Sequence, residues 1–210
     1  MHVWDVATGK EIAAFKPPLA SSISFSPDGE YLAIGSSNAT VQLWRAATGV
    51  MTTEFNVNTI PSDLACSPNG KYVAVNRKDD PFALAIWDTT LKTEIAVVKH
   101  NAGIRDIQFS LDGRYLATAS DDRTARIWDV VTGTELSRVS YDSGVVAIAF
   151  SDDGRYLATA TSDGIVHTWF RRSDELADLI CNRLSHNLTQ EEWTRYVGKQ
   201  PYRKTCPNLP

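Results

Sequence analysis

An all-β fold built from a repeated unit of about four strands is the fold class that this sequence predicts. Two sequence landmarks recur with one period, and short apolar runs alternate with turn residues between them. The composition is that of a folded chain, because 43% of the 210 residues are hydrophobic and 22% are charged. The elements of the repeat follow from these landmarks.

The first landmark is a short phrase. It reads Phe-Ser-Pro-Asp-Gly-Glu-Tyr-Leu-Ala at 25–33 and returns in related form at 66–74, 109–117 and 150–158, at steps of 41 to 43 residues. The second landmark is a tryptophan with nearly the same period, at Trp4, Trp44, Trp87, Trp128 and Trp169. Two independent landmarks with one period indicate a repeat architecture.

Each repeat alternates predicted strands with turns. In the third repeat, strands expected at 104–109, 115–119, 124–128 and 135–139 are separated by a Ser-x-Asp-Gly turn, a polar turn and a Thr-Gly turn. The second repeat carries two extra residues within 76–81, which we expect to lengthen a loop. Four strands in a period of about 40–45 residues select a β-propeller, in which each repeat forms one blade.

These repeats resemble the WD-repeat family of β-propellers. The Trp-Asp pair stands at 4–5, 87–88 and 128–129, and it is lost at 44–45 and 169–170. The resemblance covers residues 2–170. We therefore assign residues 1–170 to propeller blades and expect residues 171–210 to form a helical C-terminal tail that packs on the propeller.

The resemblance implies a buried, hydrogen-bonded tetrad in each regular blade. The third repeat supplies all four members, which are His100, Thr118, Asp122 and Trp128. An indole N–H buried between strands needs an acceptor, which a Thr hydroxyl provides, and an Asp in the turn orients the imidazole. The structural interpretation is preferred to a catalytic triad, because a working nucleophile must be exposed at a cleft.

The other repeats match this tetrad less well. The fourth keeps Thr159, Asp163 and Trp169 but has Tyr141 in place of the histidine, so we expect a partial tetrad there. The second repeat has Val75 at the hydroxyl position. The first cannot form the network, because its residues at these positions are Lys16, Ile34, Asn38 and Trp44. We expect blades of uneven stability.

A count of strands predicts about four blades of a larger ring. The chain starts inside a blade, and no outer strand follows Trp169. Members of the family commonly have six to eight blades, so the resemblance implies a ring of seven or eight. Either N-terminal blades are missing from a longer chain, or a second copy closes an eight-bladed ring. We favour the longer chain.

The resemblance also points to a partner-binding face at one end of the blades, beside the tetrad. Its candidates in the third repeat are Gly103, Arg105 and Asp121, and their counterparts in the fourth are Gly144, Val146 and Ser162. Rigid loops on a propeller are suited to recognition. A purely solvated role for these residues is the alternative.

Other function classes find little support in the composition. The net charge is −4, which gives no electrostatic reason to expect nucleic-acid or anionic-membrane binding, and no apolar run is long enough for a membrane span. We identify no catalytic residues, no metal-ligand spacing and no cofactor motif. A propeller hydrolase, the enzymatic alternative, would need carboxylates or a metal converging in the channel. The expected partners are proteins or peptides, in the cytoplasm.

The tail changes to a helical pattern. Ser173 can cap a first helix whose apolar face is Leu176, Leu179, Ile180 and Leu184. Thr189 and Glu192 form a capping box for a second helix that includes Trp193. Cys181 and Cys206 could approach each other, and a bond between them is the alternative; in the expected reducing setting we favour two reduced thiols.

The segments 187–193 and 205–207 resemble the C-terminal tail of bacterial, notably cyanobacterial, WD-repeat proteins. Such proteins often carry an upstream STAND-type nucleotide-binding ATPase or a caspase-like, TIR or kinase domain. The resemblance implies a non-catalytic scaffold or sensor module, either free-standing or acting as the regulatory end of a larger signalling protein.

Overall fold

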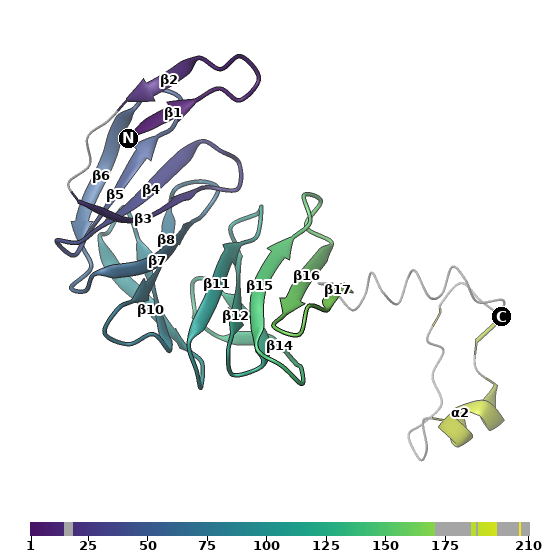
Figure 1. The fold of residues 1–210 in the computed structure, drawn as a ribbon. Coiled ribbons are helices and arrows are strands. Elements are labelled where there is room, and N and C mark those ends of the chain that lie inside the picture. The colour runs from purple at the N-terminus through teal and green to yellow at the C-terminus, as the bar shows by residue number, and fades with distance from the viewer. Residues whose placement is uncertain (15–18, 171–185, 188, 197–205, 207–210) are drawn as a thin grey trace. The chain divides into compact units, whose positions relative to one another are not determined.

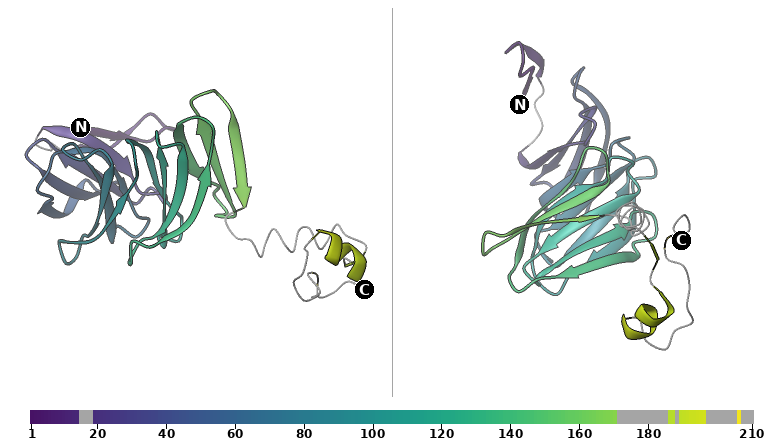
Figure 2. Two further views of the ribbon diagram at one scale, coloured as in Figure 1. Left: turned by 90° about the horizontal axis from the view of Figure 1, so that it is seen from below. Right: turned by 90° about the vertical axis from the view of Figure 1, so that its right-hand side faces the viewer.

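The computed structural model describes residues 1–14, 19–170, 186–187, 189–196 and 206. The chain divides into two compact units, Met1–Thr168 and Trp169–Pro210. The first unit is built of antiparallel sheets that follow one another along the chain (Figures 1 and 2). Together with the repeats, these sheets show a partial β-propeller.

Each sheet is one blade, whose strands run outward in chain order. Blade one contains β3 (Ala20–Phe25), β4 (Tyr31–Ser36), β5 (Thr40–Arg45) and β6 (Val50–Asn56). Blade two contains β7 (Pro61–Cys66), β8 (Tyr72–Arg77), β9 (Ala83–Asp88) and β10 (Thr93–Lys99). Blade three contains β11 (Ile104–Phe109), β12 (Tyr115–Ser120), β13 (Thr124–Asp129) and β14 (Glu135–Ser140).

The first and last sheets are smaller. β1 (His2–Trp4) and β2 (Glu11–Ala14) form a two-stranded hairpin. Blade four has three strands among the described residues, β15 (Val145–Phe150), β16 (Tyr156–Thr161) and β17 (Val166–Phe170). In blade two, β8 continues to Arg77, so the lengthened loop is shorter than the sequence predicts and spans 78–82.

The recurring phrase builds the turn between the first two strands of a blade. In blade three, the Tyr115 N–H donates to Ser110 Oγ at 3.0 Å, and the Gly113 N–H donates to the Ser110 carbonyl at 2.8 Å. Gly113 has φ of +67°, a left-handed conformation that suits glycine. The turn fixes the register in which Leu116 pairs with Phe109 and Thr118 with Ile107.

The hydrophobic core lies between neighbouring blades. The inner strands β3, β7, β11 and β15 lie side by side. Between blades two and three, Leu84 and Ile86 pack in one cluster with Phe109 and Leu116. Phe25 holds the same repeat position as Phe109, yet it is 51% exposed against 2% for Phe109. The β1–β2 hairpin packs against Leu32 and Ile34, but among the described residues no full sheet precedes blade one to bury Phe25 as blade two buries Phe109.

In the tail unit, the capping box and the second helix are confirmed. The helix α2 spans Gln190–Tyr196; Thr189 Oγ1 accepts the Glu192 N–H at 3.2 Å, and the Thr189 N–H donates to Glu192 Oε2 at 2.8 Å. The first predicted helix, at 173–184, lies outside the described residues. Within the described part of the chain, no helix is long and apolar enough to cross a membrane.

The expectation of reduced thiols is wrong for Cys206, which is disulfide-bonded, whereas Cys66 is free and buried. Cys181 lies outside the described residues. Cys206 is also tied to Asn187, whose side-chain amide bonds the Cys206 backbone N–H and carbonyl, each at 2.9 Å. The expectation rested on a reducing compartment, in which disulfides are rare.

Candidate interaction surface

A chain of hydrogen bonds inside blade three joins the four residues of the expected tetrad. The Trp128 Nε1–H donates to Thr118 Oγ1 at 2.9 Å, and Thr118 Oγ1 lies 2.7 Å from His100 Nε2. His100 Nδ1 lies 3.0 Å from Asp122 Oδ2. Thr118 Oγ1 accepts the indole N–H, so the Thr118 hydroxyl donates its own hydrogen to His100 Nε2. The Nδ1–H of the same imidazole then donates to Asp122.

Arg126 extends this network and was not singled out from the sequence. Its side chain is 5% exposed, and its Nη2 donates to Asp122 Oδ2 at 2.7 Å. Its Nη1 donates to Glu135 Oε2 at 3.2 Å, and its Nε donates to Thr124 Oγ1 at 2.9 Å. The signal was available, because side chains two apart on a strand share a face, and Arg126 precedes Trp128 by two.

The titratable groups of this network are held in defined charge states. Burial lowers the pKa of His100, outweighing the effect of the nearby Asp122 carboxylate, and this favours the neutral imidazole. Burial acts to raise the pKa of Asp122, but bonds from the Asn101 N–H and the Thr124 hydroxyl, together with His100, lower it well below its usual range. A neutral imidazole therefore donates to a carboxylate that stays ionised.

Thr118 is completely buried. A catalytic nucleophile must be exposed at a cleft, so we interpret this hydroxyl as structural. The described residues contain no group of three or more His, Cys, Asp or Glu side chains placed to hold a metal ion. We assign no catalytic or cofactor role to the network.

Blade two lacks the polar network. Val75 occupies the Thr118 position and Val57 the His100 position, and both are buried in an apolar cluster with Trp87. The Trp87 Nε1–H is buried and has no hydrogen-bond partner among the described residues. Asp79 corresponds to Asp122, but it lies exposed and accepts the Thr59 hydroxyl instead.

Blades one and four use other solutions. In blade one, the Trp44 indole donates to Gln42 Oε1 at 3.3 Å, and Gln42 holds the Arg126 position; Lys16 lies outside the described residues. In blade four, the Tyr141 hydroxyl lies 2.6 Å from Thr159 Oγ1. Asp163 accepts the Thr161 hydroxyl at 2.6 Å, and Trp169 is 38% exposed.

Five of the six candidate partner-binding residues come together next to this network. The Asp121 N–H donates to the Gly103 carbonyl, and the Ser162 N–H donates to the Gly144 carbonyl. A Cβ at Gly144 would lie 3.5 Å from Asp121 and 3.8 Å from the Ser162 hydroxyl. Blades three and four therefore meet at this point.

The charges on this surface pair with each other. Arg105 Nη2 lies 2.6 Å from Asp121 Oδ2, and the hydrogen bond that Arg105 donates to Asp121 raises the pKa of Arg105. Both side chains remain exposed, so the pair contributes little stability and stays open to an external partner. Val146, the sixth candidate, lies on β15 and is 43% exposed. We call these six residues the tetrad-end surface.

Comparison with known proteins identifies the class. The family described as "WD domain, G-beta repeat" matches residues 10–45, 92–129 and 134–169, together just over half of the chain. The chain belongs to this family. WD-repeat domains generally serve as protein-interaction scaffolds and are typically non-catalytic.

The relatives are similar over part of their length. The chain is 31% identical over 125 residues to Protein HIR1 of Yarrowia lipolytica, covering 50% of this chain and 12% of that protein. It is 29% identical over 133 residues to WD repeat-containing protein SL1-17 of Schistosoma mansoni, covering 58% and 40%. The chain thus spans less than half the length of these curated relatives.

A solved structure shares the fold. The crystal structure of the computationally designed Ika4 protein matches with a TM-score of 0.57 and 21% identity, covering 78% of this chain and 99% of that one. At this identity the likeness concerns the fold alone.

Proposed function

We propose that the chain is a non-catalytic interaction module whose tetrad-end surface binds a protein or a peptide. The observation that carries this proposal is the convergence of Arg105 and Asp121 with the backbone of Gly103 and Gly144 at the junction of blades three and four. Two exposed charges stand there, Arg105 on β11 and Asp121 in the turn after β12, beside the buried network of blade three. Val146, on β15 of blade four, is exposed as well. A rigid support with polar and apolar groups at its rim is suited to recognition.

The test uses peptides selected against the purified chain from a random displayed library. Their affinities are measured by calorimetry for the wild type and for Arg105→Glu. We expect this reversal to weaken selected peptides by about tenfold or more, since it repels Asp121 and removes the cationic contact. Equal affinity in the variant would count against this surface.

The matched control reverses an arginine elsewhere in the same blade. Arg114 follows the turn at the opposite end of β11 and lies over the Tyr115 ring. Arg114→Glu changes the net charge by the same amount, and we expect it to leave affinity within about twofold. Loss in both variants would indicate an effect of overall charge.

For the biological setting, we propose the sensor or scaffold part of a larger bacterial signalling protein. This rests on the resemblance of the segments 187–193 and 205–207 to bacterial WD-repeat tails. A nucleotide-binding, caspase-like, TIR or kinase module in the same reading frame would support it. The disulfide at Cys206 weighs against the cytoplasm, because disulfides are rare in reducing compartments.

A further inference from the structure

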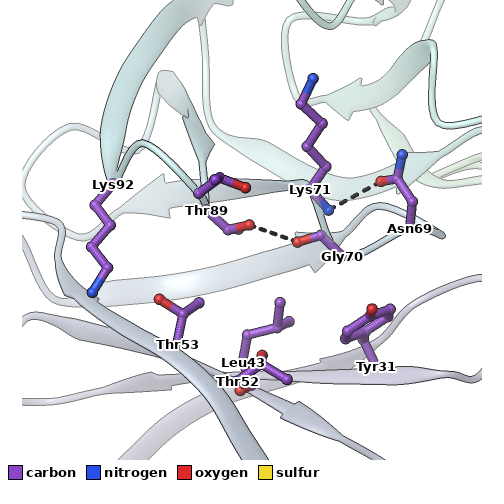
Figure 3. Close-up of a pocket in the computed structure, with 10 residues that line it drawn as sticks. Tyr31, Leu43, Thr52, Thr53, Asn69, Gly70, Lys71, Thr89 and Lys92 are labelled. Atoms are coloured by element: carbon purple, nitrogen blue, oxygen red, sulfur yellow. Dashed lines mark hydrogen bonds between the residues drawn. The ribbon is translucent and has the colours of Figure 1, made fainter.

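A second surface feature lies at the other end of the blades. A pocket of about 360 Å³ opens between blades one and two (Figure 3). Blade one lines it with residues of β4, β5 and β6. Blade two lines it with the turns at 69–71 and 89–92, which lie at the opposite strand ends from the tetrad. The ten lining residues include two lysines, four threonines and a tyrosine, with no aspartate or glutamate.

Three donors in this lining have no intramolecular partner in the described part of the chain. Thr52 and Thr89 donate to backbone carbonyls, at 2.9 and 2.8 Å. The hydroxyls of Thr53 and Thr90 and the ammonium of Lys92 make no such bond. Figure 3 shows the Lys92 side chain extending toward Thr53. One cation and two hydroxyl groups thus remain available around one pocket.

The second lysine is directed elsewhere. Lys71 Nζ lies 5.0 Å from the centre of the Tyr72 ring, and Figure 3 shows its side chain pointing away from Thr53. Lys92 is therefore the cation of the pocket, and Lys71 supplies a natural control.

Lys92 also stands where the other repeats carry glycine. It follows Trp87 by five residues, as Gly49 follows Trp44 and Gly133 follows Trp128. These two glycines have φ of +65°, and Lys92 adopts the same left-handed conformation with φ of +58°. An L-residue with a side chain is disfavoured in this conformation. The turn itself does not call for a lysine, so the cation of this pocket is not explained by the backbone conformation.

We infer that this pocket binds an oxyanion on a peptide side chain, either the carboxylate of Glu or Asp or a phosphoryl group. Lys92 provides the charge, and Thr53 and Thr90 provide hydroxyl donors, the set that an oxyanion requires. The site lies away from Arg105, so it does not depend on the tetrad-end surface being the partner site. It gives the module a second contact at its other end.

The experiment is an NMR titration of the whole chain with capped tripeptides that carry phosphoserine, glutamate or glutamine at the centre, and with inorganic phosphate. We expect the two anionic peptides to shift the backbone amides of Thr53, Thr89 and Thr90 saturably, and the glutamine peptide to leave them in place. Raising the salt concentration should weaken the binding, because the site is open to solvent.

Lys92→Gly tests the site without threatening the fold, because glycine suits this φ. We expect it to weaken the anionic peptides by about tenfold, while Lys71→Gln and Arg105→Glu leave them within about twofold. Undiminished binding by Lys92→Gly, or no saturable shift with either anionic peptide, would overturn the inference. Inorganic phosphate that binds as tightly as the phosphoserine peptide would overturn the assignment to a peptide side chain.

Discussion

Blades two and three solve the same structural problem in opposite ways. Both must bury a tryptophan between strands. Blade three gives the Trp128 indole an acceptor and continues the bonds through His100 to Asp122. Blade two surrounds Trp87 with valines, and its indole N–H has no partner in the part of the chain that the structure describes. The comparison shows that the blade fold does not require the polar network. Where a buried polar network is present, however, each donor and acceptor in it needs a hydrogen-bond partner.

The energetic difference between the blades follows from what each substitution leaves unpaired. A buried donor without an acceptor costs about 1–3 kcal/mol, and this cost is already built into blade two. In blade three, the buried Arg126 depends on the Asp122 carboxylate. We therefore expect blade three to be the more sensitive to single substitutions, although its network is the more complete.

The largest effect is expected for Asp122→Ala. Removal of the carboxylate leaves Arg126 buried beside an empty position, and we expect a loss of about 3–5 kcal/mol in the free energy of unfolding. The measurement is urea denaturation followed by tryptophan fluorescence.

The matched control for that substitution is Asp79→Ala. Asp79 has the corresponding position in blade two but is exposed and contacts Thr59, so its removal should matter far less. Equal losses at the two positions would mean that the carboxylate acts through the turn alone and not through Arg126.

An exchange of residues between the blades is the second test. Thr118→Val gives blade three the valine of blade two and deprives both Trp128 and His100 of their partner, with an expected loss of about 2–3 kcal/mol. Val75→Thr offers the Trp87 indole an acceptor, so we expect a change within about 1 kcal/mol, since the gained bond offsets a buried hydroxyl.

The readout for this exchange is the indole N–H resonance of each tryptophan, together with its hydrogen exchange. In Val75→Thr the Trp87 resonance should move downfield and exchange more slowly. A Trp87 resonance that does not move would show that the new hydroxyl fails to reach the indole, and the proposed equivalence of the two blades would be wrong.

The sequence predicts the blades well because their turns are local. The phrase around Gly113 and the spacing to Trp128 are read directly from neighbouring residues, and the strands lie where this pattern places them. Arg126 escaped notice because a charge on a strand usually faces solvent; only packing between blades makes it buried. Lys92 and Thr53 line one pocket from two blades, which no local pattern reveals.

The smallest expected effect is on the pH dependence of stability. It also distinguishes the two blades, because the apolar cluster around Trp87 in blade two contains no histidine. Burial holds the His100 pKa below 6.5, so the unfolded chain takes up a proton at higher pH than the folded chain does. Stability from this group is therefore complete above about pH 6.5 and decreases as the pH falls toward the lower folded-state pKa. The lowered pKa of Asp122 adds a further loss at more acidic pH, which begins where an ordinary carboxyl group takes up its proton in the unfolded chain. We expect the urea midpoint to fall between pH 7.5 and 5.5 in the wild type, and to fall less in His100→Gln, whatever the stability of that variant at pH 7.5. If the urea midpoint changes equally with pH in the wild type and in His100→Gln, the pH dependence comes from groups outside the network.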